Sequence, residues 1–480
     1  MFSIIALSFF LVVMILIGLW GLRKTATLSD FFLGGRTIGP WISAFAYGTS
    51  YFSAVIFIGF AGSIGWGFGL KGLAIAAGNA IFGGLLAWFV LGKRTRKMTQ
   101  NLDVMTMPEF FHERFQGKYL KMITAIIIFV FLTPYSASVF KGLGHLFEAN
   151  FNMPYDAALL LMIGITGIYL ILGGYFAVTM TDFIQGIIML FGAVFMVSFL
   201  VGKGGGLESV LHTISQNYAV NVPAAQQPGF WLLAGLVFMT SFGTWGMPQM
   251  VQKFYAIKDE KMIYKAAVVT TLFAIVITFS AYFTGAMSHI FYSAQTRPVV
   301  DQIIPDLLTR HLPPVLMVMI LLLVLSASMS TLSSLVLVSA SAIAIDLYKG
   351  HVNPKVSKEN SLIMMRFLSG VFIVISFFIA RYKFEVIVTL MSISWGAVAG
   401  AFMAPFVYGL YWKRTTLIGV KAGMFTGLFL SIWLYFQLGS KLSPLGASIA
   451  IIVPFAVVPL VSLFTCPPQQ RLLDKAFEAI

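Results

Sequence analysis

Hydroxyl side chains are clustered inside two apolar segments of this 480-residue chain. Residues 326–334 read Ser-Ala-Ser-Met-Ser-Thr-Leu-Ser-Ser, and Ser330, Ser333 and Ser334 share one helix face at i, i+3 and i+4. Thr49 lies between Gly48 and Ser50 in the second segment. Hydroxyl oxygens suit a small hard cation such as Na⁺, but serine and threonine also bond to helix carbonyls and pack helices together. The residue types alone leave both interpretations open.

The breaks in these apolar segments come as a pair. The second expected span contains Gly48-Thr49-Ser50, and the seventh contains Gly243-Thr244-Trp245-Gly246-Met247-Pro248. A proline lacks the amide donor that a regular helix needs. Paired interrupted helices in the two halves of a chain point to the binding site of a transporter. The spacing favours an ion-coupled transporter with an inverted repeat of five plus five helices over simple close packing at glycine.

The composition predicts an all-α polytopic membrane protein. The chain is 59% hydrophobic and 10% charged, whereas soluble domains carry about 25% charged residues. The net charge of +14 resides mainly in short loops, which argues against a nucleic-acid partner and for a lipid bilayer. The single cysteine, Cys466, excludes an internal disulfide.

Turn and charge signals divide the apolar runs into about 13 transmembrane helices. They lie near 2–21, 38–66, 71–92, 119–146, 155–173, 177–202, 229–252, 265–292, 313–345, 361–381, 384–410, 416–437 and 444–465. Retention of lysine and arginine in the cytoplasm predicts the N-terminus outside and the C-terminus inside. The loops then assigned to the cytoplasm hold Arg23, Lys24, Arg36, Lys93, Arg94, Arg96, Lys97, Lys253, Lys258, Lys261, Lys349, Lys355, Lys358, Lys413 and Arg414.

These helices are expected to form one transporter domain, 1–480, in the cell (inner) membrane. Helix 1 covers about 2–21, the first repeat about 38–202 and the second about 229–410. Two further helices, about 416–465, precede a short cytoplasmic tail, 466–480. No obligatory protein partner is evident in the sequence.

Several polar residues inside the spans have two interpretations each. Asp182 should face a cavity or an ion, or cap the start of its helix. Lys141 could meet a substrate carboxylate, although extension toward the membrane surface is favoured. Asn79 and Tyr135 line a pocket or form interhelical hydrogen bonds. The chain shows no nucleophile–base set, phosphate loop or metal spacing of histidines, so we expect no enzyme and no catalytic residue.

Short motifs along nearly the whole chain resemble the sodium/solute symporter family, closest to its sodium/proline permease branch. They are Asp30-Phe31-Phe32-Leu33-Gly34-Gly35-Arg36-Thr37-Ile38-Gly39-Pro40, Met107-Pro108-Glu109-Phe110-Phe111-His112-Glu113-Arg114-Phe115, Gly173-Gly174 with Thr181-Asp182, Met329-Ser330-Thr331-Leu332-Ser333, and Asp346-Leu347-Tyr348-Lys349. The resemblance implies a LeuT-like fold and alternating access driven by a Na⁺ gradient.

The resemblance also implies the ion ligands. At the main Na⁺ site they are the carbonyls of Thr49, Phe52 and Ala327 with the hydroxyls of Ser330 and Thr331. Relatives that resemble sialic acid transporters hold a second Na⁺ with an aspartate and three serines. Asp182, Ser330, Ser333 and Ser334 match that set.

The chain departs from the family pattern around the substrate. Proline permeases carry an aspartate where this chain has Tyr51, and a Trp and a Tyr where it has Thr240 and Thr244. The tyrosine that acts as an inner gate in sugar-transporting relatives is therefore absent at Thr244. Trp245 keeps a neighbouring aromatic side chain, and Tyr135 matches a pocket tyrosine of the proline branch.

We therefore predict Na⁺-coupled symport of a small polar or carboxylated metabolite, such as proline or another organic acid, into the cell by alternating access. The expected substrate-binding residues are Tyr51, Ser53, Asn79, Tyr135, Thr240, Thr244 and Trp245. The alternatives are a Na⁺-coupled sugar or sialic acid symporter and a proton-driven or facilitative transporter. A channel would need a continuous polar path, whereas the polar residues here gather at the two breaks.

Overall fold

The computed structural model describes residues 2–24, 28–172, 174–353 and 355–478. Side chains at 2–4, 22–24, 28, 165–172 and 358–359 are outside this description. Gly173 of the family motif and the side chains of Arg23, Lys24 and Lys358 therefore lie outside the described residues. The described chain is helical throughout, apart from loops and one isolated parallel bridge between Ile38 and Ile257.

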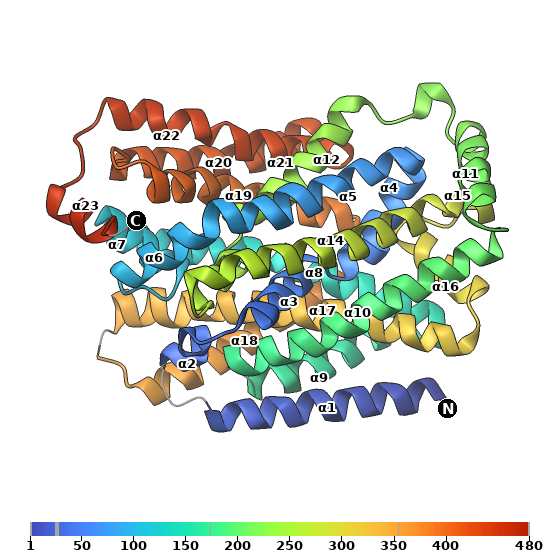
Figure 1. Cartoon of the computed structure of the whole chain (residues 1–480), viewed down its shortest axis with the longest axis horizontal. Coiled ribbons are helices and arrows are strands. Elements are labelled where there is room, and N and C mark those ends of the chain that lie inside the picture. The colour runs from blue at the N-terminus through green and yellow to red at the C-terminus, as the bar shows by residue number, and fades with distance from the viewer. Residues whose placement is uncertain (1, 25–27, 173, 354, 479–480) are drawn as a thin grey trace.

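The helices follow one another along the whole chain (Figure 1). In the first half they are α1 (Phe2–Lys24), α2 (Leu28–Leu33), α3 (Pro40–Tyr51), α4 (Ala61–Phe68), α5 (Leu73–Gly78), α6 (Lys93–Asn101), α7 (Met107–Phe115), α8 (Leu120–Phe151), α9 (Tyr155–Leu172), α10 (Tyr175–Lys203), α11 (Leu207–Asn221) and α12 (Phe230–Phe242). In the second half they are α13 (Pro248–Ala256), α14 (Ile263–Ala286), α15 (Ser288–Phe291), α16 (Ile303–His311), α17 (Pro314–Ser341), α18 (Lys358–Arg381), α19 (Ile387–Tyr411), α20 (Leu417–Leu438), α21 (Ser443–Ile452), α22 (Pro454–Leu463) and α23 (Gln470–Ala476).

Shorter 3₁₀ or π-helical segments join or extend these helices. They are η1 (Gly34–Arg36), η2 (Val55–Phe60), η3 (Gly69–Gly72), η4 (Asn79–Leu86), η5 (Trp88–Gly92), η6 (Ala224–Gln226), η7 (Gly243–Gly246), η8 (Glu260–Met262), η9 (Val300–Gln302), η10 (Ala342–Val352) and η11 (Ser440–Leu442). The π-helical η10 continues α17, so this span runs past its expected end at residue 345.

The length and apolarity of the helices confirm a multi-pass membrane protein. Among the described residues, 9 helices are long and apolar enough to cross a bilayer, or up to 10 when the bent pair α12–η7 and α13 counts as one span. Large apolar side chains are exposed on the peripheral helices, among them Phe9, Phe191, Phe367 and Phe429. Soluble proteins rarely expose so much apolar surface, whereas lipid surrounds it without cost.

The first expected break is present, but it lies slightly later than the sequence suggests. Gly48, Thr49 and Ser50 are still helical in α3, and the chain leaves the helix at Phe52, with φ −111° and ψ 101°. The chain then resumes as the π-helical η2 and continues into α4. The Gly48-Thr49-Ser50 run is therefore the last turn of the helix, and the open backbone comes directly after it.

The second expected break is confirmed at its expected residues. Gly243–Gly246 forms the 3₁₀ turn η7, and Met247 is extended before Pro248 begins α13. Proline suits the first position of a helix because its missing amide has no partner there in any case. The two helical parts meet at an angle of 48°.

The chain also reverses direction between α4 and α5. Gly69 has a φ of +56°, a conformation that favours glycine. Figure 1 shows α4 toward the right end of the molecule and α6, reached through α5, η4 and η5, at the left end. The stretch Val55–Asn101 therefore contains two arms, as the expected separate spans at 38–66 and 71–92 require.

Two helices form the buried centre of the bundle. Most residues of α17 and α19 are buried, and α17 packs against α3, α8 and α10. The hydroxyl-rich segment of α17 consequently faces protein on all sides, where its polar groups need partners. The last turn of α3 lies against this segment.

Candidate ion and substrate site

Hydroxyls of α17 meet a carbonyl of α3 where α3 ends. The hydroxyls of Ser330 and Thr331 each donate to the carbonyl oxygen of Thr49 at 3.1 Å. Both hydroxyls also lie 3.1 Å from the carbonyl oxygen of Ala327 in α17. All four residues are fully buried. Four of the five residues that the resemblance assigns to the main Na⁺ site therefore come together.

The break after α3 makes the Thr49 carbonyl available. The last carbonyls of a helix have no amide partner four residues further along the chain. The Phe52 amide still bonds to the Gly48 carbonyl at 3.1 Å, and the backbone then becomes extended. Among the described residues no hydrogen bond places the carbonyl of Phe52 at this point, so its role as a ligand stays a prediction.

This group of oxygens fits Na⁺. Two carbonyl oxygens and two hydroxyl oxygens are hard, uncharged donors, which hard cations prefer. Hydroxyl hydrogens rotate to suit their surroundings. Ser330 and Thr331 can therefore turn their lone pairs toward a cation and release the bonds that they now donate to Thr49 and Ala327.

Asp182 lies well inside α10 and does not cap it. The helix begins at Tyr175, and its N-cap residue is Gly174. The Asp182 side chain is fully buried, and neither of its oxygens has a hydrogen-bond partner among the described residues. The capping interpretation is therefore wrong, and the interpretation of Asp182 as a cavity- or ion-facing carboxylate remains.

The cation that faces Asp182 in this structure is Lys253 of α13. Its ammonium nitrogen lies 3.7 Å from Asp182 Oδ2 and 3.2 Å from the Ser334 hydroxyl. Ser334 is also 2.8 Å from the hydroxyl of Ser50, while the Ser333 hydroxyl donates to the Ser330 carbonyl. The residues matched to a second Na⁺ site are close together, and an ammonium lies among them.

Sequence reasoning missed this lysine because it placed Lys253 in a cytoplasmic loop. The structure instead buries Lys253, which is 1% exposed, in a helix that begins at Pro248. A signal was present: Pro248 is a typical first residue of a helix, and Lys253 lies five residues further along that helix. The positive-inside rule assigns lysines to a side of the membrane but cannot say which of them fold inward.

A small cavity of about 20 Å³ adjoins the break after α3. Five of the seven expected substrate residues line it, and they come from four different segments of the chain. The lining consists of Tyr51, Phe52, Ser53, Val55, Ile56, Phe60, Asn79, Tyr135, Thr240, Tyr282 and Met391. The described residues that line this cavity are polar or apolar but uncharged.

The other two expected substrate residues lie outside this lining. The Thr244 hydroxyl donates to the Ser241 carbonyl at 3.0 Å. The Trp245 indole donates to the Phe82 carbonyl at 3.0 Å, and its ring packs on Phe242. Both residues therefore stabilise the second break, and the substrate cavity adjoins the first.

Tyr51 connects the first break to α12. Its hydroxyl donates to the Thr240 carbonyl at 2.5 Å, and the Thr240 hydroxyl donates to Asn79 Oδ1 at 2.8 Å. Its ring stacks on Phe52, with centroids 4.1 Å apart. The phenol at a position where proline permeases have an aspartate thus forms one wall of the cavity.

Three aromatic or flexible residues of this region were not expected from the sequence. Tyr282 of α14 and Met391 of α19 line the cavity, and the Trp395 ring stacks on Tyr51 and meets Tyr135 edge-on. None of them belongs to an interrupted segment. Only the packing of α14 and α19 against the first break brings them there, so motif spacing could not have indicated them.

Lys141 has neither of the partners considered for it. Its ammonium lies 2.7 Å from Asp301 Oδ2 and donates to the Glu385 carbonyl at 2.8 Å. Asp301 also accepts from the Ile387 amide at the start of α19. Asp301 and Glu385 lie between the candidate spans, so the extension of Lys141 toward the membrane surface stays a prediction, while the buried carboxylate is a partner that the sequence did not indicate.

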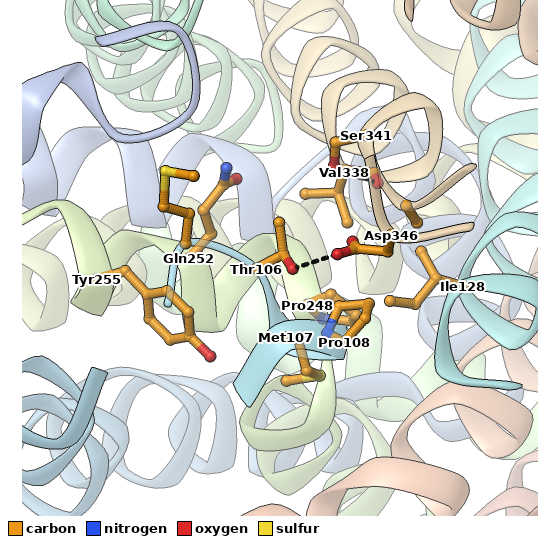
Figure 2. A pocket seen from close by; sticks show the side chains of 12 residues that line it. Thr106, Met107, Pro108, Ile128, Pro248, Gln252, Tyr255, Val338, Ser341 and Asp346 are labelled. Atoms are coloured by element: carbon orange, nitrogen blue, oxygen red, sulfur yellow. Dashed lines mark hydrogen bonds between the residues drawn. The ribbon is translucent and has the colours of Figure 1, made fainter. Parts of the chain in front are cut away.

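A second small cavity, also of about 20 Å³, lies beside α13 (Figure 2). Figure 2 shows Thr106 and Asp346 joined by a hydrogen bond, which measures 3.0 Å, near Gln252 and Tyr255 of α13. Lys121 completes this polar group at 3.3 Å from Asp346. Two family motifs, beginning at Met107 and Asp346, therefore meet around this cavity.

Backbone contacts hold the ends of α3 and α13 together at the same end of the bundle. The Ile38 carbonyl accepts from the Lys258 amide at 3.0 Å. The Arg36 side chain donates to the Val104 carbonyl at 2.6 Å, and Arg96 donates to the Ile257 carbonyl at 2.6 Å. Burial and the nearby Arg96 guanidinium lower the pKa of Arg36. These contacts close the bundle at this end.

The match to a family model decides the class of the protein. Residues 31–427 match the model of the sodium:solute symporter family. The chain belongs to the sodium:solute symporter family. This symporter is a Na⁺-coupled secondary transporter of a small metabolite, and Na⁺ is its coupling ion.

Curated relatives cover nearly the same span of this symporter. The osmoregulated proline transporter OpuE of Bacillus subtilis (strain 168) is 30% identical over 436 residues, 88% of this chain and 87% of that protein. The sodium/proline symporter 2 of Staphylococcus saprophyticus is 29% identical over 442 residues, 90% of this chain and 85% of that protein.

Solved structures show the same fold. A Na⁺-coupled sialic acid symporter in a substrate-bound outward-open state superimposes with a TM-score of 0.82 at 18% identity, covering 98% of this chain and 99% of that one. Mhp1, a nucleobase-cation-symport-1 family transporter, has a TM-score of 0.59 at 14% identity, covering 94% and 99%. The symporter therefore has the LeuT-like architecture that the resemblance implied.

Proposed function

We propose that this symporter uses Na⁺ to import a compact amino acid or another small carboxylated metabolite, with proline as the first compound to test. One observation carries the proposal. The small cavity and the cluster of Na⁺-compatible oxygens share the same turn of chain, Thr49 to Ser53. An ion bound to Thr49 and a substrate bound against Tyr51 and Phe52 would therefore each influence the other.

The ion is proposed to bind where α3 ends. Its ligands are the carbonyls of Thr49, Phe52 and Ala327 and the hydroxyls of Ser330 and Thr331. Bound Na⁺ would hold the end of α3 against α17 and fix the conformation of the break. Because Na⁺ and substrate favour the same state, each raises the affinity for the other by the same factor.

The substrate is proposed to bind among Tyr51, Ser53, Asn79, Tyr135 and Thr240. Hydroxyl and amide groups can donate to a carboxylate or accept from an ammonium, while the rings of Phe52 and Phe60 cover an aliphatic ring or chain. In this conformation the cavity, of about 20 Å³, has room for about one water molecule, so we propose that the side chains around the break move apart to admit a small solute. The proline-transporting relatives support the same class. The sialic acid symporter supports the fold, and a sugar substrate remains the alternative.

The topology is proposed as thirteen spans in one domain, with five plus five helices in inverted repeat. The ten candidate spans become thirteen when α1 and α9 are added and Val55–Asn101 is divided at Gly69. Figure 1 shows the two termini at opposite ends of the long axis, which fits an odd number of spans. The basic α6 lies at the same end as the C-terminus, which favours that end as the cytoplasmic one and an inner-membrane location.

Transport would require the closed end of the bundle to open. The contacts of Arg36 with Val104 and of Ile38 with Lys258 tie α3 to the neighbouring loops there. The cavity beside Asp346 is lined by Ser341 of α17 and by Gln252 and Tyr255 of α13. We propose that it forms part of the inner path when these contacts separate.

The test is uptake into proteoliposomes that contain the purified protein. Radiolabelled proline, other amino acids, monocarboxylates and sugars are supplied with either Na⁺ or choline outside. Accumulation of an amino acid or small carboxylate only with Na⁺ is the expected result. Sugar accumulation in place of these compounds would overturn the substrate class. Uptake of any compound that does not respond to Na⁺ would contradict the role of the Thr49 cluster.

A further inference from the structure

Lys253 is buried at the point where the family resemblance places a second cation. Its ammonium is held between α10 and α17, 3.7 Å from Asp182 Oδ2 and 3.2 Å from the Ser334 hydroxyl. The same nitrogen lies over the ring of Tyr175, 5.1 Å from its centroid. Lys253 is 1% exposed and Asp182 is 0% exposed. Protein groups surround the pair, and bulk solvent does not reach it.

Asp182 needs a cation in this position. A buried carboxylate is very costly unless it is paired or hydrogen-bonded. Both oxygens of Asp182 lack hydrogen-bond partners among the described residues, so the positive charge of Lys253 is the compensation that the structure provides. Removing either member alone leaves an uncompensated buried charge.

The residues around Asp182 do not fit a Na⁺ ion while Lys253 is present. An ammonium offers three donors and no acceptor, so it cannot be a ligand of a cation and repels one at close range. Ser334 already accepts a hydrogen bond from Lys253, and Ser333 donates its own to the Ser330 carbonyl. The expected second ion site therefore has a cation that belongs to the chain.

The lysine is also connected to the main ion site. The Ser334 hydroxyl is 2.8 Å from that of Ser50, and Ser50 follows Thr49 directly in α3. A series of polar contacts therefore runs from Lys253 through Ser334 to Ser50. It joins α13, the helix after the second break, to the end of α3, the helix before the first break. The Lys253 ammonium therefore stabilises the contact between α3 and α17. It does so from the same side as a second Na⁺ ion bound at Asp182 would.

We propose that the Lys253 ammonium permanently replaces a second Na⁺, so that this symporter carries one Na⁺ with each substrate molecule. A tethered cation keeps Asp182 neutralised in every state but cannot be released to the cytoplasm. The driving force then comes from one ion. At zero membrane potential a tenfold Na⁺ gradient limits accumulation to about tenfold with one ion and about a hundredfold with two. The proposal rests on Na⁺ binding at the Thr49 cluster.

The first experiment counts Na⁺ ions in the purified full-length protein. Equilibrium binding of radioactive ²²Na⁺ in detergent gives the number of ions bound, and reversal potentials of substrate flux in proteoliposomes give the number moved per substrate. We expect one by both measurements. Two ions in the unaltered protein would overturn the proposal, whereas no Na⁺ binding would instead contradict the function proposed for the Thr49 cluster.

The second experiment opens the space that the lysine fills. Lys253→Ala leaves Asp182 free to bind an ion, so the number of bound Na⁺ should rise from one to two. Adding Asp182→Asn to this variant should return the number to one. Lys258→Ala, at an exposed lysine of the same region, is the matched control and should bind one ion. A Lys253→Ala protein that is folded and still binds one ion would show that the lysine does not exclude a second.

A folding defect in Lys253→Ala would not leave the question open. Lys253→Met with Asp182→Asn removes both charges at similar volume, and such replacements are often tolerated. This double variant should bind one Na⁺ at the Thr49 cluster and retain Na⁺-dependent uptake. Loss of the remaining ion in a folded double variant would place the single Na⁺ at Asp182 and overturn the proposal.

Discussion

Two buried lysine–aspartate pairs in this symporter have different surroundings. Lys141 and Asp301 lie 2.7 Å apart, and further bonds to Glu385 and Ile387 satisfy both charges. In the other pair Lys253 lies 3.7 Å from Asp182, whose oxygens lack hydrogen-bond partners among the described residues. The first pair has the geometry of a structural link, and the second lies where we propose that a lysine replaces an ion.

The comparison shows that burial of a charge does not reveal its role, whereas the completeness of its hydrogen bonding does. The Lys141 pair joins α8 to the start of α19. Lys253 donates to Ser334, whose hydroxyl lies 2.8 Å from that of Ser50, the residue that follows Thr49 of the proposed Na⁺ site. A change in the first pair should therefore affect stability, and a change in the second should affect the response to Na⁺.

The largest effect on stability is expected for Lys141→Met. It leaves Asp301 as an unpaired buried carboxylate, and breaking a buried pair in this way costs about 3–5 kcal/mol. Thermal unfolding of the purified protein in detergent should show a marked fall in midpoint temperature. Lys141→Met with Asp301→Asn removes both charges and should recover much of the loss. An unchanged midpoint in the single variant would show that the pair is not a structural link.

The largest effect on ion binding is expected for Ser330→Ala with Thr331→Ala. Both hydroxyls that face the Thr49 carbonyl are removed, while all apolar packing of α17 stays. Loss of groups that only hold the ligands of a metal site in place lowers the affinity for the metal by about 10- to 100-fold. Loss of two ligands should lower the affinity for Na⁺ by at least this factor. Na⁺-dependent uptake should then be abolished at ordinary Na⁺ concentrations.

A matched control for this double variant is Ser328→Ala. The Ser328 hydroxyl lies in the same helix but donates to the Val324 carbonyl at 2.7 Å, away from the break. Half-saturation by Na⁺ should remain close to that of the unaltered protein. If both variants respond equally to Na⁺, the hydroxyls of α17 act in packing alone and the main site lies elsewhere.

A smaller effect is expected for Asp182→Asn. Its amide keeps the volume but removes the negative charge, so the Lys253 ammonium is left uncompensated beside the main site. The added positive potential should raise the Na⁺ concentration for half-maximal uptake by roughly tenfold, which corresponds to about 1.4 kcal/mol. Uptake measured against Na⁺ concentration checks this value. A lowered concentration would reverse the sign and contradict the electrostatic argument.

The smallest effect is expected for Tyr51→Phe at the cavity. The ring stays, and only the hydrogen bond to the Thr240 carbonyl is lost, which is worth about 0.5–1.5 kcal/mol. The substrate KM should therefore rise by a factor of roughly two to ten. Trp245→Phe, outside the cavity lining, should leave the substrate KM nearly unchanged and serves as the comparison. A larger effect at Trp245 would move the substrate toward the second break.

Sequence reasoning located the break regions and the shared face of the α17 serines because both depend on local rules, whereas the ion ligands follow from the family resemblance and stay a prediction. Pro248 cannot continue a helix, and serines at i, i+3 and i+4 must share one face. The same rules placed the first break a few residues early, at Gly48 to Ser50, because glycine permits a break without requiring one. Five of the seven expected substrate residues line one cavity in the structure, and their role in binding stays a prediction.

The partners that sequence reasoning did not find are distant in the chain. Lys253 is 71 positions from Asp182 in the sequence, and Lys141 is 160 positions from Asp301. Neither pairing follows from local periodicity or from the charge of a loop. Thr244 and Trp245 belong to the expected break, but their hydrogen bonds to Ser241 and Phe82 keep them out of the cavity lining.

The sequence by itself determined that this chain is a helical membrane transporter with hydroxyl-bearing and interrupted helices. Composition determines whether a helix lies in lipid or in water, and residue spacing determines the face of the helix that a side chain occupies. Only the tertiary structure decided which faces meet. It brought Thr49 to Ser330 and Thr331, placed Tyr282 and Met391 at the cavity, and inserted Lys253 beside Asp182. The physical reason is that a buried charge takes the partner that packing supplies, and packing joins helices that are far apart in the chain.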